Sequence, residues 1–464
     1  MQLANSTTAV IKKITLFISV SFIYTFASAQ ENSPYSRYGM GDIVPAQNIV
    51  SRSMGGITAG FIDSVGFIPY NFLNGKLNFP SSSINLSNPA SLGSLNTTIF
   101  DVGGEVDVRT LKSNNSPQKY KATNTLISYL QLGFPVTPKR MLAKGNSLNI
   151  AFGLRPVTRI NYKILADKSL VGIDSVITLY EGTGGISQAN FSTGLRIKNF
   201  SFGASTGYSF GNRQNSTRLS LKNSDSVRYM QSNTQSDARF GGFFLTLGAQ
   251  YGIRLKNQNV LRIGVSTNLQ QNLKAKKSNI NETFVYDNNG NSIAIDTVTN
   301  SMDQKGTITL PATYTVGFTY TSKHWITGVD VDYAQWSKYR YFGVKDAVQN
   351  NTTVHVGAQY FPADPTTLSS KYWKFVKYRA GFYFGNDYVK LNNTNRPDYG
   401  LTLGASLPLT SFQRMRLGEF VTLNTGLEIG QHGNKQNQSL REGIVRINFG
   451  ISMSATWFQK SKYN

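Results

Sequence analysis

Two pairs of acidic residues have a spacing that would allow joint chemistry. Asp330 and Asp332 stand in "WITGVDVDYAQW", and Glu105 and Asp107 stand in "GGEVDVRT". Residues two apart on a β-strand share one face, so each pair would present two carboxylates side by side, an arrangement that can serve general acid–base catalysis. The sequence places no nucleophile, metal-ligand set or phosphate-binding motif beside them. We therefore predict that the protein is not an enzyme and uses no cofactor or metal.

The residues that most often build metal and redox sites are scarce. Cysteine is absent, and the three histidines, His324, His355 and His432, are scattered along the chain. A disulfide, a thiol nucleophile and a cysteine-based metal site are therefore excluded, and the histidines are expected to be ordinary strand or surface residues.

The N-terminus has the pattern of an export signal. Lys12 and Lys13 precede an apolar run over residues 14–26, and Ala27-Ser28-Ala29 follows. This pattern predicts a signal peptide over residues 1–29, with a retained anchor helix as the alternative. Its apolar run is too short to span a bilayer as a helix, and no later stretch reaches 18 apolar residues. Any membrane span of the exported chain must then be made of strands.

Strict alternation of apolar and polar residues recurs along the chain. In "GIVRINFGISMSATWFQK", residues 443–460, every second residue is apolar, and the residues between are polar or glycine. One apolar face for lipid and one polar face for a lumen is the pattern of a transmembrane β-barrel. We predict an all-β fold with a 14-stranded antiparallel barrel over residues 96–464, its last strand pairing with its first. The predicted strands begin near residues 97, 123, 147, 184, 199, 239, 258, 305, 324, 353, 372, 397, 416 and 441.

The predicted connections differ in length between the two ends of the barrel. Short turns near residues 196, 255 and 321 alternate with long polar segments at 212–237 and 276–304, which are predicted to be outer loops. Tryptophan supports this orientation, since it favours the lipid–water boundary. Trp325, Trp373 and Trp457 fall at predicted periplasmic strand ends and Trp336 at an outer end. A soluble secreted β-sandwich is the least favoured alternative.

Residues 30–95 do not alternate and are rich in Gly, Ser, Asn and Pro. A lumen of 14 strands is too wide to be filled by wall side chains alone. Hydrophobic residues are also too frequent here for a solvated linker. We predict that this segment forms a plug, or hatch, inside the barrel; the alternative is a disordered periplasmic tail.

The segment "SMGGITAG" followed by "SNPASLGSL" resembles the N-terminal hatch of the FadL-like (long-chain fatty acid transporter) outer-membrane family. The matching residues are Gly55 and Gly56 of the glycine-rich entry, followed by Asn88, Pro89 and Ala90. The segment "LPATYTVGFTYTSKHWITGVDVDYAQWSKYRYF" is similar to a strand pair of that family, and the ending "WFQKSKYN" resembles barrels of the Bacteroidota. The resemblance implies a 14-stranded barrel with an N-terminal hatch that admits hydrophobic compounds. Some relatives are instead subunits of secretion machinery.

Polar residues on the predicted lumen face suggest how a hatch would be held. A polar latch would consist of Asp330, Asp332, Glu105, Asp107, Arg109 and Arg446. The simpler alternative is ordinary lumen polarity, since charges facing a lumen are inexpensive.

The formal net charge of +23 is spread along the chain and not clustered on a helix, so nucleic acid is not the predicted partner. Anionic lipopolysaccharide and lipid head groups of the outer membrane are the predicted partners.

We predict an outer-membrane barrel that takes up small hydrophobic or amphipathic molecules past its hatch. The alternative is a non-transporting subunit of a larger outer-membrane assembly for secretion or envelope biogenesis. The long stretch over residues 61–86, which enlarges the hatch, favours the alternative.

Overall fold

The computed structural model describes most of the chain after the predicted signal peptide. The described residues are 33–63, 81–113, 118–170, 173–221, 230–287, 292–363, 371–391, 394–410, 419–435 and 440–455. The signal peptide, Trp457 and much of the long stretch over residues 61–86 lie outside them. Among these described residues, no helix is both long enough and apolar enough to cross a membrane.

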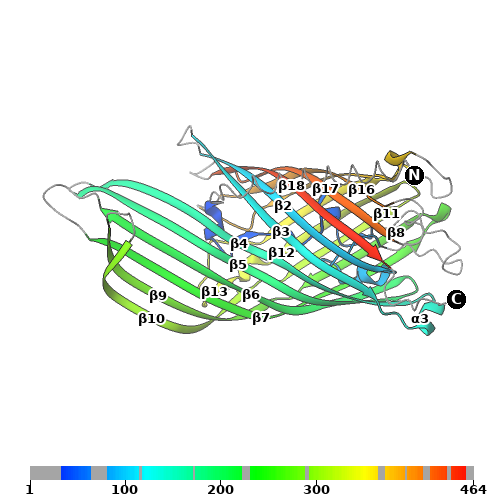
Figure 1. Cartoon of the computed structure of the whole chain (residues 1–464), viewed down its shortest axis with the longest axis horizontal. Coiled ribbons are helices and arrows are strands. Elements are labelled where there is room, and N and C mark those ends of the chain that lie inside the picture. The colour runs from blue at the N-terminus through cyan, green and yellow to red at the C-terminus, as the bar shows by residue number, and fades with distance from the viewer. Residues whose placement is uncertain are drawn as a thin grey trace, which may run out of the picture.

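The strands form one closed antiparallel barrel of 14 strands, as predicted (Figure 1). β8 and β9 both pair with β7 and together form one barrel strand. In the same way, β10 pairs with β9 and β11 pairs with β8, so β10 and β11 together form the next barrel strand. The barrel strands are β2 (Thr98–Lys112), β3 (Lys119–Pro135), β4 (Ser147–Leu170), β5 (Ile173–Ile197), β6 (Phe200–Leu221), β7 (Gln231–Arg254), β8 (Val260–Asn268), β9 (Gln271–Tyr286), β10 (Ser292–Leu310), β11 (Thr313–Thr321), β12 (Trp325–Ala334), β14 (Asn351–Tyr360), β15 (Lys377–Asn386), β16 (Pro397–Pro408), β17 (Phe420–His432) and β18 (Arg441–Ala455).

The barrel closes where the last strand meets the first. β18 pairs with β2 in one unbroken register from Arg441 opposite Lys112 to Ala455 opposite Thr98. Closure pairs the backbone amides of both terminal strands, which a sheet surrounded by lipid requires. The predicted pairing of the last strand with the first is therefore confirmed.

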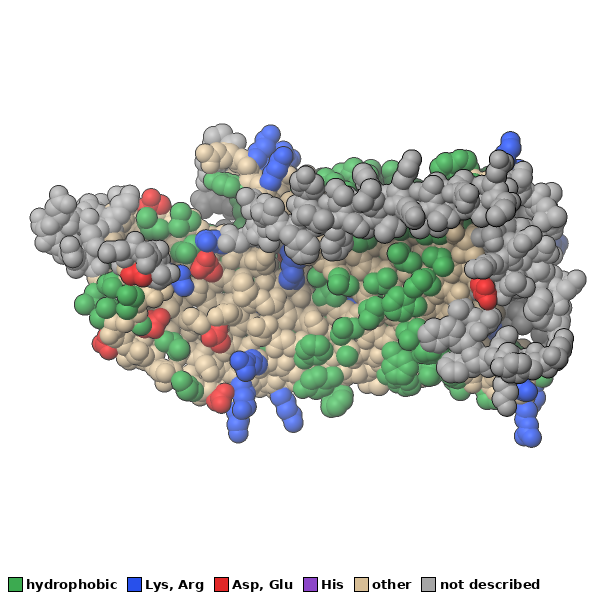
Figure 2. Space-filling view, viewed as in Figure 1, with side chains coloured by type: hydrophobic (Ala, Val, Ile, Leu, Met, Phe, Trp, Pro, Cys, Tyr) green, Lys and Arg blue, Asp and Glu red, His purple; other side chains and the backbone are tan. Residues whose placement is uncertain are grey.

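The outward face carries a belt of exposed apolar side chains around the barrel. On β18, Ile447 is 53% exposed, whereas its neighbours Arg446 and Asn448 are buried. Figure 2 shows such hydrophobic side chains gathered over the part of the barrel where all strands are present. The alternation read from the sequence thus sorts lipid-facing from lumen-facing residues.

The two segments predicted to be long outer loops are largely strand. β6 runs on to Leu221, β7 begins at Gln231, and β9 and β10 pair along most of residues 271–310. Together with β4 and β5 they project far beyond the other strands as a one-sided wall (Figure 1). The prediction of loops was wrong because a strand beyond the apolar belt can have both faces exposed, as Ser292–Asn300 of β10 do, so apolar alternation no longer marks it.

The short turns on the opposite end are as predicted. β5 and β6 are joined through Lys198, whose φ is +55°, and β11 and β12 are joined by residues 322–324. Trp325 and Trp373 are exposed, as belt residues should be. Trp336 is not: it is 6% exposed and packs on Tyr388 with the ring centroids 4.4 Å apart.

Residues 33–63 and 81–97, here called the N-terminal segment, contact inward-facing side chains of several barrel strands, among them Glu105, Asp330 and Thr402. The segment contains few regular elements, and most of its residues are buried. Its elements are η2 (Pro34–Arg37), β1 (Asp42–Ile43), α2 (Ile49–Arg52) and η4 (Pro89–Ser94). The remaining short elements lie in barrel connections: α3 (Lys139–Ala143), η5 (Lys256–Gln258), η6 (Trp336–Lys338), β13 (Arg340–Tyr341) and η7 (Tyr372–Phe375).

Candidate functional site

The contacts between the N-terminal segment and the barrel wall contain most of the buried charge. Arg52, the last residue of α2, places Nη1 2.5 Å from Oε2 of Glu105 on β2. Arg446 on β18 lies 2.9 Å from Glu428, 3.4 Å from Asp107 and 3.8 Å from Glu105. Strand alternation places these side chains on the lumen face, and closure of β18 on β2 brings them together.

Arg109 on β2 forms a second group of ion pairs. Its guanidinium lies 2.8 Å from Asp42 of β1, 3.0 Å from Asp107 and 3.7 Å from Glu442. Asp42 belongs to the N-terminal segment, so Arg109 joins that segment to the wall. Glu105, Asp107, Arg109 and Arg446, which the sequence grouped as latch candidates, therefore lie in one connected network.

The other candidate pair, Asp330 and Asp332, lies on β12. Oδ2 of Asp330 accepts hydrogen bonds from the backbone N–H groups of Thr58 at 2.5 Å and Ala59 at 2.7 Å. Asp332 contacts the N-terminal segment only indirectly, since it lies 3.2 Å from Nε2 of His355, whose Nδ1 is 2.6 Å from the carbonyl of Gly55. The two carboxylates share a face, as predicted, but only Asp330 binds the segment directly.

The motif residues of the predicted hatch make close contacts with the wall. Asn88 caps η4 by accepting from the N–H of Ala90, and it donates to the carbonyl of Ala59. Pro89 begins η4 and touches the wall at Gly203, where a side chain would overlap it. Gly55 and Gly56 have φ of +71° and +94°, a region that favours glycine. Both also lack the space for a Cβ: at Gly55 it would lie 2.6 Å from the carbonyl of Val356.

A third ionic contact involves residues that the sequence analysis did not select. Asp63 lies 2.6 Å from Nζ of Lys377 and 3.4 Å from Arg379, both on β15, and it accepts a hydrogen bond from Ser82. Burial acts to raise the pKa of Asp63, but the charges of Lys377 and Arg379 outweigh it and hold the pKa below its usual value. The only sequence signal was an isolated acid within a segment predicted to be buried.

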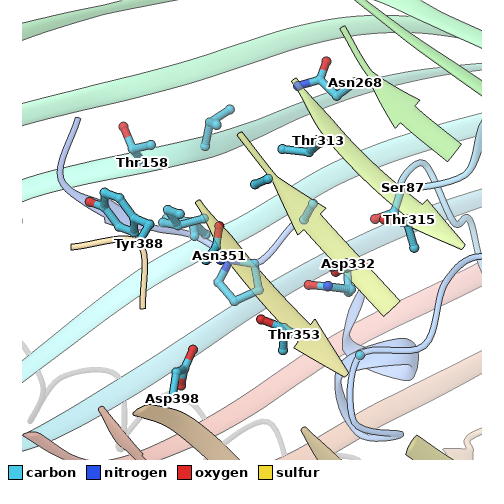
Figure 3. A pocket seen from close by; sticks show the side chains of 18 of the residues that line it. Ser87, Thr158, Asn268, Thr313, Thr315, Asp332, Asn351, Thr353, Tyr388 and Asp398 are labelled. Carbon is cyan, nitrogen blue, oxygen red and sulfur yellow. The ribbon is translucent and has the colours of Figure 1, made fainter. Parts of the chain in front are cut away.

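A cavity of about 420 Å³ lies between the N-terminal segment and the wall. Its lining is rich in hydroxyl, amide and charged groups (Figure 3). In the figure, Thr313, Thr315, Asp332, Asn351 and Thr353 come from neighbouring strands, and Ser87 comes from the N-terminal segment. Ligand pockets for hydrophobic compounds are lined mainly by apolar and aromatic groups. The lining here mixes such groups, among them Val44, Phe244 and Leu310, with the polar ones, so the cavity can hold an amphipathic molecule as well as water.

The barrel wall is interrupted beside this cavity. β3 and β4 pair only between Leu130–Pro135 and Asn149–Leu154. Within the described residues, the rest of β3, from Lys119 to Tyr129, pairs only with β2, whereas β4 takes β1 as a partner through Arg159 and Thr158. The N-terminal segment therefore stands where the wall between β3 and β4 is open.

No group of three or more histidine, aspartate or glutamate side chains in the described chain is arranged to hold a metal ion. The buried carboxylates instead face arginine, lysine, hydroxyl or backbone N–H groups. The site can fix the N-terminal segment in place, and its cavity can hold water or a small amphipathic molecule.

The fold is similar to that of two solved structures. A FadL homologue from Pseudomonas aeruginosa matches with a TM-score of 0.53 and 13% identity, over 90% of this chain and 100% of that one. The toluene transporter TodX from P. putida matches with a TM-score of 0.51 and 15% identity, over 90% of this chain and 100% of that one. None of the curated proteins matches the sequence. A family model described as BamG matches residues 10–464.

Proposed function

The chain belongs to the BamG family, and we propose that it acts as a non-transporting barrel subunit of an outer-membrane assembly. In this proposal, residues 1–29 are a signal peptide, residues 30–95 form a plug and residues 96–464 form the barrel. The plug seals the lumen, and the barrel serves as a membrane-embedded partner for other envelope proteins. The Bacteroidota origin stays a prediction.

The observation that carries the proposal is the way the N-terminal segment is tied to strands on many sides. It contacts β2 through Arg52, β12 through Thr58 and Ala59, and β15 through Asp63. It also reaches β16, where Thr402 accepts from the N–H of Gly55 at 2.8 Å. Removing one partner of a buried ion pair costs about 3–5 kcal/mol, because the other charge is left buried and unpaired. Withdrawal of the segment would break several such contacts at once, so it is better suited to a permanent seal than to a gate.

The projecting wall provides surface for a partner. Along β10, Ser292–Ser301 are exposed on both faces except for the last residue, which is half-buried. Ile293, Ile295, Val298 and Met302 are each at least half exposed there. Apolar side chains gathered beyond a membrane belt are typical of contact sites for other proteins.

The proposal is tested by isolating a tagged chain from native envelopes after reversible cross-linking and mild detergent extraction. We expect at least one other envelope protein at near-equal stoichiometry. A shortened variant that joins Asn279 to Ser301, which lie opposite each other on β9 and β10, should fold as a heat-modifiable barrel but lose that protein. Recovery of the tagged chain alone under all extraction conditions would contradict the proposal.

A second candidate function is uptake of small hydrophobic molecules. The opening between β3 and β4 beside the cavity favours it, because a ligand could pass sideways there into the bilayer. The similar structures are those of a FadL homologue and a toluene transporter. This candidate predicts that liposomes containing the purified protein admit toluene or a fatty acid faster than protein-free liposomes. The subunit proposal predicts equal rates.

A further inference from the structure

Four basic side chains meet at the outer ends of β18, β2 and β3. Arg441 lies directly opposite Lys112, and Lys112 lies directly opposite Lys119, so the three residues form one row across the strands. Lys121 stands in the next row of the same face, opposite Thr110. Directly opposed residues of antiparallel strands are about 5 Å apart. The arrangement therefore concentrates three to four positive charges on a small area.

This row faces away from the lumen. On β18, Glu442 and Ile444 are 1% exposed and point inward, so Arg441, Gly443 and Val445 point outward. On β2, Arg109 is buried on the lumen side, and the alternation again places Thr110 and Lys112 outward. Figure 2 shows several basic side chains together on the surface near the β2–β3 hairpin.

No acidic residue of the described chain balances these charges. Within that part of the chain, an ion pair is formed by none of Arg441, Lys112, Lys119 and Lys121. Lys112 instead experiences the like charges of Lys119 and Arg441. Like charges directly opposite on a sheet are destabilising. Lysines often protect an exposed strand edge from unwanted pairing. That explanation suits β3 but not β2 and β18, which are paired on both sides. An external anion would remove the repulsion in all three strands.

The row also borders open space on the outer wall that an anion could occupy. Gly443 lies between Arg441 and Val445 on the outward face, and a Cβ there would meet only the carbonyl of Thr110, at 3.9 Å. The side chain of Thr110 stands beside this space, with Lys121 on its other side. A hydroxyl donor surrounded by ammonium and guanidinium groups is the donor set that phosphate prefers.

The apolar belt begins just below the row. Val445 is 42% exposed and Ile447 is 53% exposed on β18, and Val108 follows Thr110 on the outward face of β2. Four residues along a tilted strand place Arg441 about 10 Å above Val445. An anion bound at the row would thus sit at head-group height, with its acyl chains on the belt. The β2–β3 hairpin lies at the end opposite the barrel termini Thr98 and Ala455, which is the outer end in barrels of this type.

We propose that Lys112, Lys119, Lys121 and Arg441 bind the phosphate groups of lipopolysaccharide in the outer leaflet, with Gly443 leaving space beside Thr110 for a phosphate. The inference does not depend on the subunit role, because a lipid site on the outer wall suits a transporter equally well.

The test uses the full chain in detergent and measures retained lipid by native mass spectrometry. The probes are bis-phosphorylated lipid A, dephosphorylated lipid A and inorganic phosphate. We expect the wild-type protein to retain the phosphorylated lipid at least 10-fold better than the dephosphorylated lipid, and 1 mM phosphate not to displace it. Equal retention of the two lipids would overturn the proposal. Displacement by phosphate would also overturn it, because the site would then be one for a free anion.

Two variants isolate the site. The triple variant Lys112→Gln, Lys119→Gln, Arg441→Gln should lose at least 10-fold in retention. A matched triple variant at α3, Lys139→Gln, Arg140→Gln, Lys144→Gln, removes the same charge at the other end of the barrel and should retain the lipid. Gly443→Val keeps every charge but occupies the space beside Thr110, and it should also reduce retention. It provides the decisive reading if the triple variant does not fold, and unchanged retention in Gly443→Val would then contradict the proposal.

Discussion

The guanidinium of Arg52 and the carboxylate of Glu105 lie 2.5 Å apart, and their side chains are only 3% and 4% exposed. One belongs to the N-terminal segment and the other to the first barrel strand. A charge this deeply buried must be matched, so removing either partner is far more costly than removing both.

The first prediction concerns this pair. Arg52→Met should lower the free energy of unfolding by about 3–5 kcal/mol, because it leaves Glu105 without its closest partner. The double variant Arg52→Met, Glu105→Leu should lose clearly less than the sum of the two single variants. Urea titrations of the protein in detergent micelles measure all four forms. Strict additivity would show that the pair does not hold the segment.

The second prediction separates the two aspartates of β12. Asp330→Asn should destabilise the protein by about 1.5–3 kcal/mol, because the charged acceptor for two backbone N–H groups is lost. The matched variant Asp332→Asn should have a smaller effect, since that side chain is 34% exposed and contacts only His355 in this region. Equal losses in the same titration would contradict the assignment of Asp330 as the residue that binds the segment.

The third prediction is a pH dependence from Asp63. Lys377 and Arg379 hold its pKa below the usual value of 3.8, so the ionised form stabilises the folded protein above about pH 4. This stabilisation is lost as the pH falls through the lowered pKa. The difference in melting temperature between wild type and Asp63→Asn should be constant from pH 7 to 5 and shrink below pH 4. A difference that grows on acidification would have the wrong sign.

The fourth prediction uses the close contact of two backbones. A Cβ on Gly264 of β8 would overlap the carbonyl of Ala59, whereas a Cβ on Gly252 of β7 would meet only the carbonyl of Asn199, at 3.9 Å. Gly264→Ala should displace the N-terminal segment and allow trypsin to cleave after Arg52, which is buried in the wild-type protein. Gly252→Ala should stay protected. Cleavage after Arg52 in both variants, or in neither, would contradict the packing.

The architecture was largely predictable because lipid imposes a simple rule on side chains. Val445, Ile447 and Phe449 point toward lipid, and Arg446 and Asn448 point toward the lumen. The alternation therefore reveals the strand directly. The same rule failed for residues 276–304, where Ser292–Asn300 of β10 are exposed on both faces. It also misjudged Trp336, because a tryptophan in a connection can pack on an inward residue such as Tyr388 as readily as at a lipid boundary.

The site was predictable only in its composition. Alternation placed Glu105, Asp107 and Arg109 on the lumen face, and the structure joins them with Arg446 through barrel closure. Partners that depend on the path of the N-terminal segment were not predictable. Asp63 and Lys377 are separated by 314 residues, and no local pattern links them. The role of Gly264 was hidden for the same reason, since only the fold brings Ala59 against it.

The central claim, a lumen closed by the N-terminal segment, is tested most directly by the conductance of the purified wild-type protein in planar lipid bilayers. Reconstitution of the folded protein is verified by antibody or by trypsin resistance at Arg52. We predict that the reconstituted protein shows no stable open conductance level at the applied voltages. Steady, porin-sized conductance from the intact protein would contradict a sealed barrel.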